Sequence, residues 1–151
     1  MTEALLAFAH LSAILGWVVF ASSLAALCRP DWFNAAVLRR LRRLDAILWL
    51  ATAVVLLTGL ARIVWGARGA TWYLGNGLLH LKLALFVTVA ALMAGPTRRL
   101  ARWQAALDAD GALPGADDIR AVRWRVMLAT HVVALIPLAA VFLARGYGAR
   151  G

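Results

Sequence analysis

Several kinds of residue that support common protein functions are scarce in this sequence. Cys28 is the only cysteine, so an intrachain disulfide is excluded and no cysteine cluster suggests a metal site. Acidic residues number 7 against 16 lysines and arginines, and the formal net charge is +9. Polar residues as a whole are few, because 64% of the chain is hydrophobic, whereas soluble proteins have roughly 45–50%. This composition excludes an ordinary soluble domain.

Four long apolar runs account for the composition. Each is close to the ~17–25 residues that a helix needs to cross the hydrocarbon layer of a bilayer. They cover Ala4–Leu27, Ala46–Trp65, Leu78–Ala94 and Val126–Ala144. The first run is longer than the apolar part of a signal peptide and has no basic segment before it, so we expect a retained span. The sequence predicts an all-α fold: an integral membrane four-helix transmembrane bundle, with residues 1–151 as one domain.

The basic residues are concentrated in two of the segments that join these runs. They are Arg39, Arg40, Arg42 and Arg43 after the first run, and Arg98, Arg99, Arg102, Arg120, Arg123 and Arg125 after the third. Cytoplasmic loops carry such an excess. We therefore expect both segments to contact anionic lipid headgroups in the cytoplasm, and both termini to lie outside a bacterial inner membrane. Topology explains the charge, so we expect no nucleic-acid partner. A homo-oligomer stays an open alternative.

Three local signals indicate where helices begin, end or bend. Asp31, which follows Pro30, predicts an N-cap for a helix that continues into the second run. Gly95 and Pro96 predict the end of the third helix. Pro137, within the fourth run, leaves a backbone carbonyl without its helical donor and predicts a kink.

Two histidines lie at matching depth in the apolar runs. At ~1.5 Å per residue, His10 lies ~8 Å outward of the midpoint of the first run, and His80 ~8–9 Å outward of the midpoint of the third. His131 falls near the midplane, and its role stays open. Two imidazoles from different helices at one level can ligate a haem iron, and bundle cores hold such cofactors. In the simpler alternative, each histidine hydrogen-bonds across helices.

Lys82 is the only lysine, and it lies in an apolar stretch. A charge in a membrane span costs roughly 2.5–3.5 kcal/mol on insertion scales, so it needs a reason. Residues two apart on a helix point about 200° apart, so His80 and Lys82 cannot face one point. Lys82 either extends to the outer interface as an anchor or holds an anionic group, such as a haem propionate or an acidic substrate. Glu3 is the nearest acidic residue, and Arg62 is either an interfacial anchor or a second clamp for a carboxylate.

His10 followed by Trp17, together with His80 followed by Lys82, resembles two related groups of membrane proteins. These are the HemJ-type protoporphyrinogen oxidases and the CopD-like membrane domains, which have a His-x6-Trp pattern in the first helix and a His-x-Lys pattern in a later one. The resemblance implies a b-type haem. It implies His10 and His80 as the metal ligands, with Lys82 and Arg62 near the propionates and Trp17 beside the cofactor.

A second resemblance covers most of the chain. The stretches GLARIVWGARGATWYLGN, KLALF, GPTRRLARW and LIPLAAVFLARGYG resemble a bacterial family of small four-helix membrane proteins without an assigned activity. The leading hypothesis is a b-type haem-binding redox protein, an oxidoreductase if it is an enzyme. The alternative is a non-enzymatic membrane module that acts through contacts between helices or with a partner. Transport of a small anion past Lys82 and Arg62 is a third reading, although four spans are few for a transporter.

Overall fold

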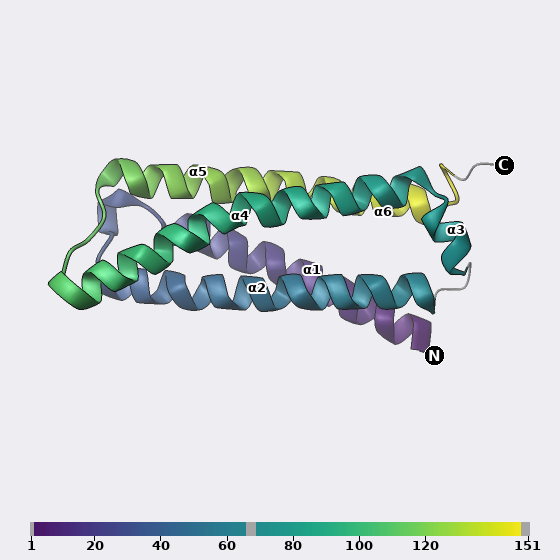
Figure 1. Ribbon diagram of the computed structural model, residues 1–151, viewed down its shortest axis with the longest axis horizontal. Coiled ribbons are helices and arrows are strands. Elements are labelled where there is room, and N and C mark those ends of the chain that lie inside the picture. Colours follow the sequence, from purple (N-terminus) through teal and green to yellow (C-terminus); the bar gives the residue numbers. More distant parts are fainter. Residues whose placement is uncertain (1, 66–68, 149–151) are drawn as a thin grey trace.

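The computed structural model describes residues 2–65 and 69–148, and helices make up nearly all of this part of the chain (Figure 1). The elements are α1 (Thr2–Leu27), a 3-10 turn η1 (Pro30–Trp32), α2 (Ala35–Val64), the short α3 (Ala70–Leu74), α4 (Gly77–Asp110), α5 (Ala116–Val133) and α6 (Leu135–Ala144). Within the described residues, four helical segments are long and apolar enough to cross a membrane: Ala4–Leu27, Ala35–Val64, Gly77–Asp110 and Ala116–Ala144. The prediction of an all-α bundle with four spans is confirmed.

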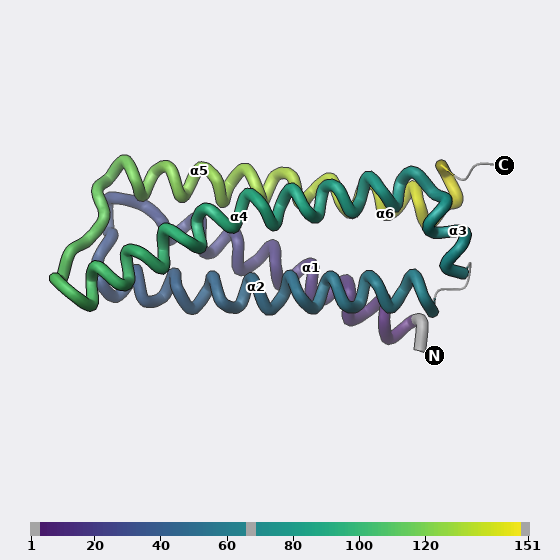
Figure 2. The backbone as a smooth tube through the Cα atoms, in the orientation of Figure 1, coloured from purple at the N-terminus to yellow at the C-terminus, as the bar shows by residue number. Residues whose placement is uncertain are grey.

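The four long segments run alternately up and down, as the tube in Figure 2 shows. α1 packs mainly on α2, and α4 packs mainly on α5 and α6, while α1–α5 and α2–α4 contacts join the two pairs. α1 begins and α6 ends at the end of the bundle that carries α3, which we call the α3 end (Figure 1). The clustered arginines lie at the opposite, arginine-rich end, in the first part of α2, the last part of α4 and the first part of α5.

The core is most completely buried toward the arginine-rich end. The side chains there that have no exposed surface are Leu24, Cys28, Leu38, Leu41, Leu100, Val122 and Val126. Large apolar side chains elsewhere on the helices face outward, and Leu5, Phe8, Leu57 and Val87 are between 61% and 70% exposed. Such an apolar surface is what a helix that faces lipid presents. The bundle is therefore built with a packed interior and a hydrocarbon-facing exterior.

A buried carboxylate joins α2 to α4 near the arginine-rich end. Asp45 is 2% exposed. It accepts a hydrogen bond of 2.7 Å from the Thr97 hydroxyl and pairs with Arg42 at 3.2 Å. The Trp49 indole donates to the same Thr97 hydroxyl at 2.8 Å. These bonds hold the two helices together at this end, whereas α2 and α4 diverge toward the α3 end (Figure 1).

Two of the three helix-boundary predictions were wrong. Asn34, not Asp31, is the N-cap of α2, because its side-chain oxygen accepts from the backbone N–H groups of Ala36 and Val37 at 3.0 Å. Asp31 lies in η1 and pairs with Arg29 at 3.8 Å.

Gly95 and Pro96 do not end the third helix, because α4 continues through them to Asp110. Two side chains that follow the proline contact carbonyls one turn earlier: the Thr97 hydroxyl, whose hydrogen is shared with Asp45, lies 3.0 Å from Met93 O, and Arg98 Nε donates to Ala94 O at 3.1 Å. The carbonyl that Pro96 leaves without its helical donor is that of Leu92, four residues earlier. The kink expected near Pro137 coincides with a break in the helix, since α5 ends at Val133 and α6 begins at Leu135.

Candidate functional site

Two side chains of α1 are fixed to two threonines of α2. His10 Nδ1 lies 2.8 Å from the Thr58 hydroxyl oxygen, and Trp17 Nε1 donates to the Thr52 hydroxyl at 3.0 Å. The Thr58 hydroxyl donates its own hydrogen to Val54 O at 2.6 Å, and the Thr52 hydroxyl donates to Leu48 O at 2.7 Å. Each threonine thus satisfies a backbone carbonyl four residues earlier and also bonds a side chain of α1.

Only one edge of the His10 ring has a polar partner. Nδ1 is held by the Thr58 hydroxyl, and the direction of that bond depends on which ring nitrogen carries the hydrogen. Nε2 is buried and has no hydrogen-bond partner among the described residues, and His10 as a whole is 4% exposed. The imidazole is therefore fixed on one edge and surrounded by apolar groups on the other.

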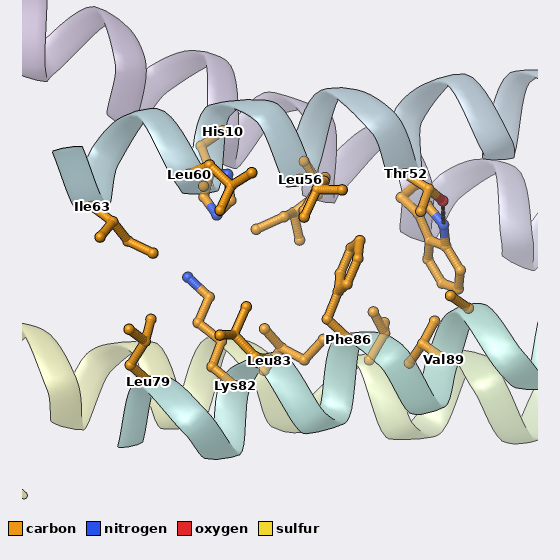
Figure 3. A pocket seen from close by; sticks show the side chains of 17 residues that line it. His10, Thr52, Leu56, Leu60, Ile63, Leu79, Lys82, Leu83, Phe86 and Val89 are labelled. Carbon is orange, nitrogen blue, oxygen red and sulfur yellow. Dashed lines mark hydrogen bonds between the residues drawn. The ribbon is translucent and has the colours of Figure 1, made fainter. Parts of the chain in front are cut away.

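His10 lines a cavity that lies mainly between α2 and α4 (Figure 3). The cavity has a volume of about 70 Å³, which is room for a few water molecules. Its walls are apolar apart from a few side chains, and the polar lining residues are His10, Trp17, Thr52 and Lys82. On α2 the lining extends from Thr52 to Ile63, which is ~16 Å along the helix axis. The site is thus a slot parallel to the helices, with its polar groups at separate points.

Lys82 extends from α4 into the slot, and in Figure 3 its amine points toward His10 from the opposite wall. Among the described residues, Lys82 forms no ion pair and no hydrogen bond. The side chain of Glu3, the acidic partner that the sequence left open, lies outside the described residues. Arg62 is partly buried on α2, and its charge acts on both His10 and Lys82. The α3 end of the slot is therefore cationic.

The slot opens sideways on the apolar exterior of the bundle. Three of its lining residues are also exposed on the outside: Leu56 by 40%, Leu60 by 47% and Leu83 by 37%. They come from α2 and α4, the two helices that diverge here (Figure 1). The mouth of the slot is therefore bordered by apolar side chains.

The other two histidines lie outside this site. His80 is on an exposed face of α4 and does not line the slot, which agrees with the argument that His80 and Lys82 point apart. His131 is also exposed, and its Nδ1 bonds Met127 O at 2.7 Å. In the described part of the chain, no group of three or more potential metal ligands comes together. A haem with both His10 and His80 as axial ligands does not fit this arrangement, because only His10 reaches the slot.

One protein family matches the chain along nearly its whole length. The profile of a family described as "Predicted membrane protein (DUF2214)" matches residues 2–148. The chain belongs to this family. The match includes every helix of the DUF2214 bundle, so the resemblance to a family of small membrane proteins is confirmed. No curated protein and no solved structure matches the chain. The local similarity to HemJ-type and CopD-like proteins is not shown by these matches.

Sequence reasoning identified the side chains of the DUF2214 site better than their partners. His10, Trp17 and Lys82 were singled out and are in the slot, but Thr52 and Thr58 were not expected to hold the first two. One signal was available, because His10 and Trp17 are seven residues apart and Thr52 and Thr58 are six apart. Donors and acceptors at nearly equal spacing on two antiparallel helices lie at matching levels.

Proposed function

We propose that this DUF2214 protein is a membrane-embedded binding protein for an amphiphile with an anionic head and an apolar body. One observation carries the proposal: Lys82 points into an apolar slot and has no partner among the described residues. An unpaired cation in a membrane span is costly, and a bound anion offsets that cost through a charge-assisted hydrogen bond. Arg62 adds positive charge at the same end of the slot.

The shape and the apolar walls of the slot are evidence that part of the ligand is apolar. A single hydrocarbon chain would lie parallel to the helices along the ~16 Å between the levels of Ile63 and Thr52, with most of its volume in the side opening toward the lipid, because the cavity itself has only about 70 Å³. The side opening between α2 and α4 supports entry from the lipid rather than from water. Such a site is concave, mostly apolar and carries a few polar groups, as ligand sites in proteins generally do.

The proposal includes an orientation in the membrane. The arginine-rich end is cytoplasmic by the positive-inside rule, in contact with anionic headgroups of a bacterial inner membrane, and both chain termini are outside. The cationic part of the slot then lies in the outer half of the bilayer. The bound amphiphile would place its head toward the outer surface and its chain toward the midplane.

Photo-crosslinking tests the binding function. The protein is reconstituted in vesicles of neutral lipid with a photoactivatable fatty acid, and labelled residues are mapped by mass spectrometry. We expect labels on the slot residues of the parent, and roughly 10-fold weaker labelling in Lys82→Met because a charge-assisted bond is lost. His80→Gln is the matched control, since His80 is two residues away on the same helix but outside the slot, and its labelling should equal that of the parent.

Equal labelling of Lys82→Met and the parent would overturn the binding proposal. Haem, predicted from the sequence, is the alternative occupant, and the free Nε2 of His10 is the observation in its favour. A Soret band in the purified protein that is lost in His10→Ala would support haem in place of an acyl chain. If that band survives in His80→Ala, His10 is the axial ligand from the protein and His80 is not.

A further inference from the structure

We infer that the bundle holds the head of a phosphatidylethanolamine lipid in a hollow at its arginine-rich end. The hollow lies between α4 and α5 and has a volume of about 350 Å³. Its lining consists of Arg99, Arg102, Trp103, Ala106 and Asp118. The inference does not depend on what occupies the slot, because no described residue lines both.

One face of α4 forms most of the hollow. Its four lining residues on α4 follow one another at the i, i+3, i+4 and i+7 spacing that places side chains on one side of a helix. Asp118, in the first turn of α5, is the lining residue from the other helix. The hollow therefore presents charges of both signs, two arginines from one helix and a carboxylate from its neighbour.

The hollow lies at the level of the lipid headgroups. The third apolar run ends at Ala94, and at ~1.5 Å per residue Arg99 and Arg102 are ~8 Å and ~12 Å further along α4. The headgroup layer on each side of the hydrocarbon is roughly 5–8 Å thick. Helical side chains lean toward the N-terminus of their helix, which for α4 is the hydrocarbon side. The two guanidinium groups are therefore within reach of lipid phosphates.

The charged groups of the hollow still have hydrogen-bonding capacity. Arg102 forms no ion pair and no hydrogen bond among the described residues. Arg99 and Asp118 pair at 3.1 Å through one nitrogen and one oxygen, so the second oxygen of the carboxylate has no partner in the described part of the chain. The Asp118 side chain is 59% exposed, so a ligand can reach it.

A zwitterionic head matches this arrangement. In phosphatidylethanolamine a phosphate is joined through two carbon atoms to a primary ammonium. The phosphate can accept from Arg102 and Arg99, whose planar N–H groups suit phosphate oxygens, while the ammonium donates to Asp118. Phosphatidylglycerol would place negative charge beside the Asp118 carboxylate without an ammonium to offset it. Phosphatidylcholine has the phosphate, but three methyl groups replace the hydrogens that the ammonium would donate.

Lipid retention measured by native mass spectrometry tests the inference. Delipidated protein in detergent is given phosphatidylethanolamine, phosphatidylcholine and phosphatidylglycerol with identical acyl chains, so that only the heads differ. In the parent we expect phosphatidylethanolamine to be retained roughly 3-fold more than phosphatidylcholine, because an exposed ion pair contributes modestly. In Asp118→Asn this preference should disappear, and retention of phosphatidylglycerol should rise because Arg99 loses its partner.

The chain offers a matched control for each charge. Asp117 pairs with Arg120 and lies outside the hollow, so Asp117→Asn should keep the lipid preference of the parent. Arg102→Gln should lower the retention of all three lipids roughly 3-fold, because each of them has a phosphate. Arg98→Gln should leave retention nearly unchanged, since Arg98 is on the same helix but does not line the hollow.

Three results would overturn the inference. The first is equal retention of phosphatidylethanolamine and phosphatidylcholine by the parent, or a preference that survives in Asp118→Asn. The second is stronger retention of phosphatidylglycerol than of phosphatidylethanolamine by the parent, which would assign the hollow to an anionic head. The third is full displacement of the lipid by an equal concentration of glycerophosphoethanolamine, which would identify the ligand as a soluble molecule. None of these results changes the photolabelling expected in the slot.

Discussion

At the scale of single residues, the site depends on which hydrogen-bonding groups are already used. His10 and Trp17 both form a hydrogen bond from α1 to a threonine of α2, yet only the histidine has a second ring nitrogen. Trp17 is therefore fully satisfied and acts as a packing residue, whereas His10 keeps one unused group. The spacing of His10 and Trp17 in the sequence identified both residues. The difference between them depends on which groups the other helices place beside each ring, which a pattern within α1 cannot reveal.

Lys82 and His80 show what a single helix allows one to predict. The angle between residues two apart is a property of the helix alone, and it correctly separated the two side chains. Which of them faces inward depends on where α2 and α6 pack against α4, and the sequence of α4 contains no such information. The predicted pairing of His10 with His80 therefore used depth, which the helix rise supplies, without the rotation that packing decides.

Cys28 offers a test at the residue scale, at the arginine-rich end and beyond the end of α1. Its thiol is buried and donates to Ile119 O at 3.6 Å. Burial raises the pKa of the Cys28 thiol from 9.0 to about 11, although the charge of Arg123 opposes this. The reactive thiolate should therefore appear only as the pH approaches 11, well above the range for an exposed cysteine. We expect maleimide to react with the folded protein roughly 100-fold more slowly than with an exposed thiol at the same pH.

The control is the double variant Cys28→Ala/Asp31→Cys, which moves the single cysteine to a nearby exposed position. It should react at the rate of a free thiol. Unfolding in strong detergent should remove the difference between the two proteins. Rapid labelling of Cys28 in the folded protein would contradict its burial in the core.

At the scale of the elements, α2 and α4 form a contact that is closed at one end and open at the other. Asp45, Thr97 and Trp49 join the two helices at the arginine-rich end. At the α3 end, the same helices are separated by the slot. Both helices were predicted as apolar runs, but the divergence between them was not. The divergence depends on the side chains that meet between the two helices. It also involves the continuation of α4 through Pro96, where the sequence predicted the end of the helix.

Gly59 tests whether the close α1–α2 contact positions His10. A valine there would force its side chain against the imidazole, since even a Cβ would lie 3.3 Å from His10 Cε1. We expect Gly59→Val to lower the free energy of unfolding by about 1–3 kcal/mol, the usual cost of overpacking, and to weaken photolabelling of the slot. Thermal unfolding in detergent and the crosslinking assay measure the two effects.

Gly16→Val is the matched control on α1, because a Cβ at Gly16 would meet no other atom within 4 Å. Its stability should stay within about 0.5 kcal/mol of the parent, and its labelling should be unchanged. If the two valine variants behave alike, the contact between Gly59 and His10 does not position the ring.

At the scale of the whole molecule, charge is distributed unevenly along the axis of the bundle. The arginine-rich end carries the four ion pairs formed by the described residues, which involve Asp31, Asp45, Asp117 and Asp118. The slot and its cations are nearer the other end. Loop composition predicted this polarity well, because it requires only the order of spans and loops and no knowledge of packing. The four spans were predictable for the same reason.

Reporter fusions test the proposed orientation. A reporter that is active only outside the cytoplasm should be active when fused after Gly151 and silent when fused after Gly111, which lies in the loop between α4 and α5. A reporter that is active only in the cytoplasm should give the opposite result at both positions. If the first reporter is silent after Gly151 and active after Gly111, the slot opens toward the cytoplasmic half of the bilayer and would receive its ligand from that leaflet.

Because Lys82 is the only lysine, its place in the slot gives the molecule a ready-made spectroscopic probe. Reductive methylation with isotope-labelled formaldehyde modifies amines and leaves arginine untouched, so labelled methyl groups would be added only to Lys82 and to the α-amine of the chain. The dimethylammonium resonance of Lys82 would then report directly on whatever enters between α2 and α4. The fifteen arginines, which carry the rest of the basic charge, would not be methylated and would give no labelled resonance.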